Sequence, residues 1–180
     1  MWMRPSRQPK RRLCSALAVA SLLVLTPSYG AAQELDTVLT VSSGTGISLG
    51  KAESTIKKRS PLFLEIDLGL IFDGDGSLEW TPSLLVEFEG RVSVGVNPSV
   101  KRVKRWGRFA IYGGLGFPVF VAPFTLWGAE VGVGGFFTII PRRLALSLEL
   151  RADVFFAGSD LPDGTAVVKF DFALGVRMEL

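Results

Sequence analysis

The C-terminal 13 residues of the chain alternate strictly between apolar side chains and charged or small ones. The apolar positions are Val168, Phe170, Phe172, Leu174, Val176, Met178 and Leu180. The positions between them are Lys169, Asp171, Ala173, Gly175, Arg177 and Glu179. A period of two places the apolar residues on one face of a β-strand, whereas a helix would spread the charges around its surface. This segment therefore predicts a strand that closes a β-sheet at the end of the chain.

The same alternation recurs through most of the chain. It predicts six further strands, within residues 62–72, 79–89, 92–96, 108–117, 127–139 and 144–156. A weaker segment, Thr37–Val41, is also rich in β-formers. Bacterial single-chain membrane barrels have an even number of strands, so this segment becomes the first of eight. The predicted fold class is an all-β, eight-stranded, antiparallel up-and-down transmembrane barrel.

The strand order assigns the connecting segments to two ends of the barrel. Loops near residues 42–61, 89–91, 118–124 and 157–165 are expected to face outward from the cell. Turns near residues 73–77, 97–105 and 140–143 are expected to face the periplasm. The first loop is expected to be long, because residues 42–58 are rich in Gly and Ser and then basic.

The N-terminal segment has the order of a secretory signal peptide. Five basic residues and no acidic residue precede the apolar run Leu13–Leu25, and small residues follow as far as Ala32. We expect residues 1–32 to be the signal peptide and residues 33–180 to be the barrel domain. After cleavage, 15 Lys and Arg face 17 Asp and Glu, a net charge of −2, which gives no electrostatic reason to expect nucleic acid.

The composition limits the chemistry that the mature chain can perform. There is no His, and Cys14, the single cysteine, lies within the predicted signal peptide. Thiol chemistry, His-dependent triads and most zinc sites are therefore excluded, and no catalytic, cofactor or metal site is predicted.

We expect the apolar face of the barrel to contact lipid. That face has almost no polar interruption, and aromatic residues lie near the strand ends, as in interfacial girdles. A slip of one residue would turn many charges outward, and an Arg at the bilayer midplane costs about 2–4 kcal/mol. The charges should therefore line a narrow lumen as a structural network of ion pairs with ordered water. The predicted members are Glu65, Asp67, Glu79, Glu87, Arg108, Glu130, Glu149, Arg151, Asp153, Lys169, Asp171 and Arg177.

In its alternating strands and inward charges, the chain resembles the small outer-membrane β-barrel family, of the type that includes OmpX and the OmpA barrel domain. The apolar face of the last strand (Phe170, Phe172, Leu174, Val176, Met178 and Leu180) is similar to the β-signal that the barrel-assembly machinery recognises. Most members end on Phe or Trp, whereas this chain ends on Leu180. The resemblance implies a location in the outer membrane, contact with its lipids and with the assembly machinery, and a monomeric barrel without cofactor.

Two alternatives concern the architecture. Phe109–Ala129 carries no charge and is long enough to cross a bilayer as a helix. Pro118 and Pro123 would break such a helix twice, which favours strands. A soluble lipocalin-like barrel would also alternate, but with its apolar face inward.

The sequence leaves three functions open. The first is a non-enzymatic outer-membrane protein of structural or surface-interaction type. The others are a narrow channel through the charged, glycine-rich lumen and a soluble binder of a small apolar ligand. A basic set (Lys101, Arg102, Lys104, Arg105, Arg142 and Arg143) is expected on one rim, where it could contact lipid phosphates or remain a solvated edge.

Overall fold

The computed structural model describes residues 36–51, 55–59, 61–72, 77–88, 92–159, 161 and 165–180. Within these ranges the strands are β1 (Asp36–Lys51), β2 (Thr55–Arg59), β3 (Phe63–Ile71), β4 (Leu78–Glu87), β5 (Ser93–Trp106), β6 (Phe109–Gly116), β7 (Val119–Ala122), β8 (Leu126–Ile140), β9 (Leu144–Gly158) and β10 (Val167–Glu179). The predicted signal peptide, the turn at Asp73–Gly76 and the reversal at residues 89–91 lie outside the described residues.

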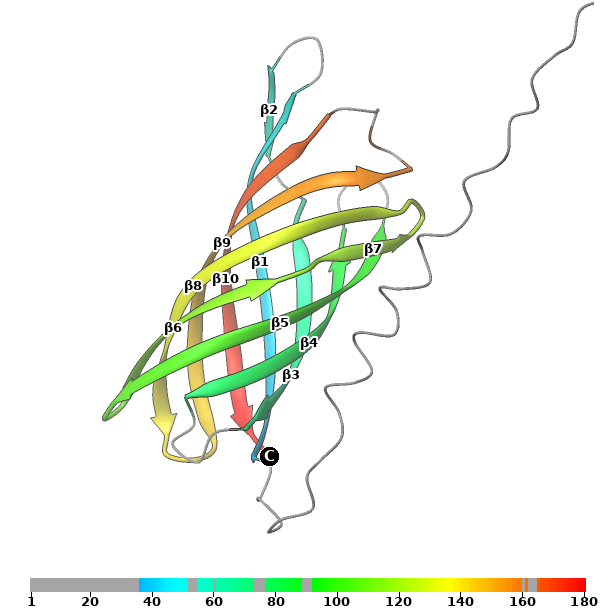
Figure 1. The fold of residues 1–180 in the computed structure, drawn as a ribbon. Coiled ribbons are helices and arrows are strands. Elements are labelled where there is room, and N and C mark those ends of the chain that lie inside the picture. Colours follow the sequence, from blue (N-terminus) through cyan, green and yellow to red (C-terminus); the bar gives the residue numbers. More distant parts are fainter. Residues whose placement is uncertain are drawn as a thin grey trace, which may run out of the picture. The chain divides into compact units, whose positions relative to one another are not determined.

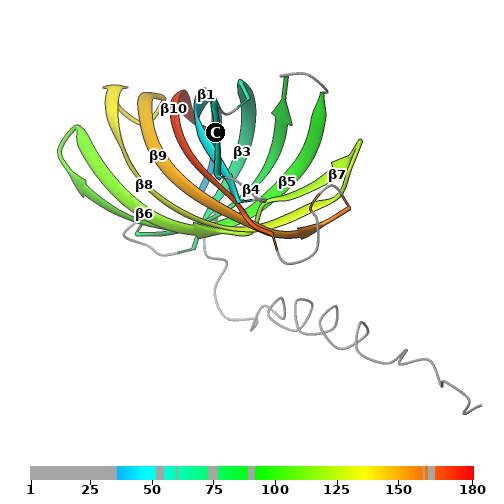
Figure 2. The ribbon, with the colours of Figure 1, turned by 90° about the horizontal axis from the view of Figure 1, so that it is seen from above.

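The strands form one closed antiparallel sheet (Figures 1 and 2). Neighbours in space follow the order β1, β3, β4, β5, β6, β8, β9 and β10, and β10 pairs with β1 to complete the ring. Strands β6 and β7 occupy one place, because both lie between β5 and β8. Strand β2 pairs only with the far half of β1. The part of the chain that the structure describes is thus an eight-stranded up-and-down barrel, as predicted.

The first strand is longer than predicted. Residues 42–51 were expected to be loop, but β1 continues through them to Lys51 and pairs with β10 as far as Gly50. Gly44 and Gly46 suit this pairing, because a Cβ at either position would meet the β10 backbone at 2.1 Å or less. The small residues therefore allow close strand contact and do not mark a loop.

The fifth strand corrects a second expectation. Residues 97–105 were expected to form a turn, but β5 runs without a break from Ser93 to Trp106. Pro98 lies opposite Pro82 of β4, and its carbonyl oxygen accepts a hydrogen bond of 3.1 Å from Phe117 N, so the pairing on both sides of β5 continues past the proline. The chain reverses only at Gly107 and Arg108, where Gly107 has a φ of 59°, as a two-residue hairpin turn requires.

The segment between residues 118 and 124 is also more regular than predicted. Val119–Ala122 is strand β7, and only Phe117 and Pro118 interrupt the ladder. Pro118 has no N–H to donate, which explains the break. Strands β6, β7 and β8 cover Phe109–Ala129, which rules out the helical alternative for this segment. No helix in the described chain has the length and apolar character to span a bilayer.

The barrel has two ends, which we call the terminal end and the loop end. The terminal end carries the start of β1, the C-terminus and the short turns at residues 107–108 and 141–143. The loop end carries β2, the last residues of β4 and β9, and the described segment 123–125 that follows β7 (Figure 1). The strands of the described chain therefore run alternately toward the two ends, as an up-and-down barrel requires.

The apolar face of each strand points away from the lumen. Large apolar side chains on this face remain exposed, such as Leu115 (69%), Val131 (51%) and Leu150 (54%). The inward face carries buried charges instead, including Glu79 at 0% and Arg151 at 6% exposure. This arrangement is the reverse of the one that a lipocalin-like soluble barrel requires.

Candidate functional site: the charged lumen

The described lumen contains eight acidic and five basic side chains. The acids are Glu65, Asp67, Glu79, Glu87, Glu130, Glu149, Asp153 and Asp171, and the bases are Lys101, Arg105, Arg151, Lys169 and Arg177. Their strands bring them together because inward positions on neighbouring strands share one face of the sheet. All the acids were predicted from the sequence, and three of the five bases were.

The strongest group at the terminal end is centred on Glu79. Arg177 donates two hydrogen bonds to the Glu79 carboxylate, from Nη1 at 3.0 Å and Nη2 at 2.6 Å. Arg105 approaches the same carboxylate at 3.6 Å and also approaches Glu179 at 3.9 Å. The bidentate geometry is the strong form of an Arg–carboxylate contact. It ties β4 to β10, which β1 and β3 separate in the ring.

Two further groups fill the middle of the lumen. Lys101 lies 3.2 Å from Glu149 and 3.9 Å from Asp67, and Tyr112 donates a hydrogen bond of 2.9 Å to the same Glu149 oxygen.

The other middle group is centred on Arg151. Its guanidinium pairs with Glu65 and approaches Glu130 at 3.6 Å. Ser83 donates a hydrogen bond to Glu65, and Asn97 donates one to Glu130. Neutral side chains therefore complete the contacts of these carboxylates.

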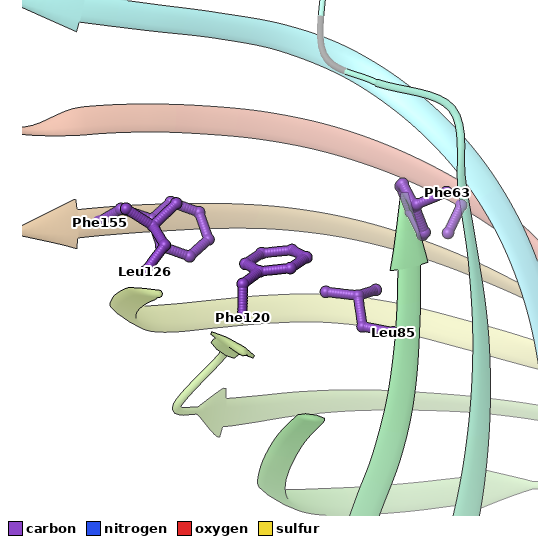
Figure 3. Close-up of a cluster of buried hydrophobic side chains, with 6 residues drawn as sticks. Phe63, Leu85, Phe120, Leu126 and Phe155 are labelled. Atoms are coloured by element: carbon purple, nitrogen blue, oxygen red, sulfur yellow. The ribbon is translucent and has the colours of Figure 1, made fainter. Parts of the chain in front are cut away.

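At the loop end the lumen becomes apolar. Lys169 pairs with Glu87 there, and Phe63, Leu85, Phe120, Leu126 and Phe155 lie close together around this level (Figure 3). The rings of Phe120 and Phe155 are 5.8 Å apart, and both side chains are 1% exposed. We call these five residues the aromatic plug.

Each of the five inward cations of the described chain contacts both a carboxylate and an aromatic ring. The rings are Tyr112 for Lys101, Phe136 for Arg105 and Arg177, Phe63 for Arg151, and Phe120 and Phe155 for Lys169. The distances to the ring centroids run from 4.5 Å for Arg151 to 5.6 Å for Arg105. A cation over a ring face is stabilised, and more so where water is excluded. This pattern is suited to holding side chains in place.

Three predicted members of the network form no salt bridge with another described residue. Arg108 lies in the exposed turn at the terminal end, and no carboxylate of the described chain is within salt-bridge distance of it. The prediction for Arg108 was wrong because β5 extends to Trp106, which carries Arg108 past the lumen. Asp153 and Asp171 point inward, but the Oδ1 atom of each has no hydrogen-bond partner among the described residues.

Lys101 and Arg105 are lumen residues that the sequence analysis missed. They were placed on a basic rim because residues 99–105 were expected to form a turn. The signal was available, because Ser93, Gly95, Asn97, Ser99 and Lys101 continue a period of two through Pro98.

Comparison with solved structures supports the architecture. The crystal structure of Neisserial surface protein A (NspA) superposes with a TM-score of 0.62, covering 80% of this chain and 97% of NspA at 11% sequence identity. The chain has the fold of a small outer-membrane β-barrel. Ail of Yersinia pestis (TM-score 0.47, 15% identity, 81% of this chain and 99% of that one) and OprG of Pseudomonas aeruginosa (0.40, 10%, 81% and 96%) overlap less closely. No family model and no curated protein matches the sequence.

Proposed function

We propose that the protein is a non-enzymatic, integral outer-membrane barrel of structural or surface-interaction type, with a lumen filled by its own side chains. The observation that carries the proposal is the opposition of the two faces of the wall. Exposed apolar residues cover the outside, while charged residues inside are almost inaccessible. Only a hydrocarbon solvent outside makes both faces favourable at once.

The contents of the lumen favour a closed barrel over a channel. The enclosed cavity beside Lys101 and Glu149 has a volume of about 20 Å³, and another near Phe136 and Arg143 has about 10 Å³. A cavity needs roughly 10–15 Å³ to hold one water molecule, so neither space could carry a hydrated ion. The aromatic plug adds a second obstruction at the loop end.

The same features argue against an enzyme. The carboxylates that could act as acid and base contact cations and hydroxyl groups that hold them in place. The described cavities leave no room for a substrate beside them. In the described chain no group of three or more His, Cys, Asp or Glu is arranged to hold a metal ion.

The closed sheet also supports the proposed partners. A closed barrel has no free strand edge, which removes the commonest route to strand-mediated association and favours a monomer. The outer face would contact membrane lipids, and β10 would present Phe170–Leu180 to the barrel-assembly machinery before it pairs with β1.

The experiment combines cell fractionation with planar-bilayer recording of the purified protein. We expect recovery in the outer membrane, heat-modifiable migration on a gel and no current steps above the baseline. Recovery as a soluble periplasmic protein would reject the membrane barrel. Regular current steps, absent from protein-free bilayers, would reject the closed lumen and favour the narrow channel.

A further inference from the structure

The lipid-facing side of the barrel is interrupted by a groove across β5, β6, β8 and β9. Its volume is about 660 Å³, and its floor lies at Gly113 and Gly135. The outward positions around these glycines hold large residues, with Ile111, Val133 and Leu148 beside the floor. The groove is therefore a place where the outer wall lacks side chains.

Gly113 is not required by the backbone. A Cβ added there would meet only the Gly132 carbonyl oxygen, at 3.9 Å, which is an ordinary contact. Gly135 differs, because a Cβ there would lie 2.8 Å from the Ala110 carbonyl oxygen. Since Gly113 relieves no clash, its effect on the outer face is to leave space.

Two cations border this space. Arg102 lies opposite Gly113, and Lys104 lies opposite Ile111, both on the outward face of β5. No carboxylate of the described residues lies within salt-bridge distance of either side chain. Lys104 lies 5.1 Å from the ring of Trp106, and exposed aromatic residues at strand ends are typical of the interface between hydrocarbon and headgroups.

The groove continues from these cations into the apolar band. The rows of paired residues Arg102–Gly113–Val133 and Lys104–Ile111–Gly135 run from β5 across β6 to β8, and β9 follows. Because the strands are tilted, each of these strands lies nearer the loop end than the one before it (Figure 1). A lipid whose phosphate lies at the terminal-end interface would have its acyl chain along these rows.

We propose that the groove binds one anionic phospholipid, with its phosphate at Arg102 and Lys104 and one acyl chain over Gly113 and Gly135. The inference rests on the proposed location in a membrane. Cations on a lipid-facing wall that no carboxylate of the described residues meets are costly unless another anion meets them, and a phosphate is the anion available at that depth. Arg also binds phosphate in a bidentate manner.

A second groove on the outer face provides a comparison within the same protein. It has a volume of about 400 Å³ and lies around Val41, Ser43, Leu174 and Val176. No charged side chain lines it. It can accept an acyl chain but gives no reason to prefer an anionic headgroup, so the preference should be confined to the groove at Arg102.

The test uses quenching of Trp106 fluorescence by lipids with brominated acyl chains. The protein carries Trp2→Phe, Trp80→Phe and Trp127→Phe, is purified from cell envelopes and is reconstituted with brominated phosphatidylglycerol or brominated phosphatidylcholine at low mole fraction. Because each nearby Lys or Arg strengthens binding of an acidic lipid about fivefold, we expect a preference for phosphatidylglycerol of at least about fivefold.

Three variants locate the site. Arg102→Gln/Lys104→Gln should remove the preference, and Gly113→Leu, which places a side chain in the groove from a Cβ with no contact shorter than 3.9 Å, should reduce it at least about threefold. Arg108→Gln/Arg143→Gln removes the same charge at the same end outside the groove and should leave the preference unchanged. Heat-modifiable migration checks that each variant is folded.

Equal quenching by both lipids in the starting protein would overturn the proposal, and so would an equal loss in the Arg108→Gln/Arg143→Gln control. An unchanged preference in Gly113→Leu would overturn the acyl-chain part. Absence of quenching by either lipid would instead reject insertion in the membrane, so the two proposals fail in different ways.

Discussion

The inner and outer faces of the barrel wall differ in both polarity and exposure, although neighbouring residues of one strand alternate between them. On β9, Leu148 and Leu150 point outward and are 44% and 54% exposed, whereas Arg151 and Asp153 point inward and are 6% exposed. A soluble protein buries the first kind of residue and exposes the second. The comparison shows that the surrounding solvent decides which face is outside, and that the lumen replaces water with matched side chains.

The largest expected effect comes from removing a cation inside the wall. Arg151→Met would leave Glu65 and Glu130 buried without their shared partner, and breaking a buried pair in this way costs about 3–5 kcal/mol. Urea unfolding in lipid vesicles, followed by tryptophan fluorescence, measures the change in the free energy of unfolding. Leu150→Met, one step away on the outer face, is the matched control and should cost less than about 1.5 kcal/mol. Equal losses for the two variants would contradict the difference between the faces.

The next largest loss in the free energy of unfolding is expected in the aromatic plug. Phe120 is 1% exposed and packs against Phe155, so Phe120→Ala should cost about 3 kcal/mol by creating a cavity at the loop end. Val121→Ala, at the neighbouring outward position, should cost less than about 1 kcal/mol, because lipid can fill the space. The same unfolding measurement compares them, and a larger loss for Val121→Ala would show that the plug is not packed as described.

A charge placed on the outer face should have a depth-dependent effect. Leu115 lies near the middle of the interrupted strand β6–β7, and Leu115→Arg should destabilise the barrel by about 2–4 kcal/mol in vesicles. Ile139→Arg, near the terminal end of β8, should cost about 0–1 kcal/mol, because its charge reaches the interface. If both substitutions had the same small effect, the outer face would be in water.

The smallest effect on stability is expected at the C-terminus. Leu180 is 73% exposed, so Leu180→Phe should change the free energy of unfolding by less than about 0.5 kcal/mol. The resemblance to outer-membrane proteins that end on an aromatic residue predicts faster assembly by the barrel-assembly machinery. The fraction of folded protein after a pulse of synthesis measures this, and Leu180→Asp should have the opposite effect. An unchanged assembly rate in both variants would remove the role proposed for β10.

The strands were predictable wherever their outward face was continuous and apolar. Apolar and polar or small side chains alternate regularly through residues 62–72 and 144–156, and both segments form strands. The prediction was wrong where small, basic or proline residues resembled a turn, as at residues 42–51 and 97–105. In those segments Ser42, Asn97, Ser99 and Lys101 face the lumen, and Pro98 faces another proline, so the alternation was a better guide than residue type.

The partners inside the lumen were less predictable than its composition. The sequence indicated which acids face inward, but Arg151 and Glu65 are 86 residues apart, and Arg177 and Glu79 are 98 apart. Which of them meet depends on the stagger of the strands around the barrel, which hydropathy does not encode. The sequence analysis assigned Arg108 to the lumen in place of Lys101 and Arg105 because it ended the fifth strand too early. The position of a strand end therefore decides which cations are predicted to face inward.

The most direct test of the account is the solvent that contacts Leu115. A nitroxide attached to Leu115→Cys in a Cys14→Ser background, with the protein in lipid vesicles, reports its collisions with oxygen and with a water-soluble nickel complex. With a lipid-facing outer wall, oxygen should relax the label more strongly than nickel at Leu115, and the order should reverse for a label at Arg108→Cys in the exposed turn. Nickel collisions at Leu115 as frequent as those at Arg108 would contradict a lipid-facing outer wall.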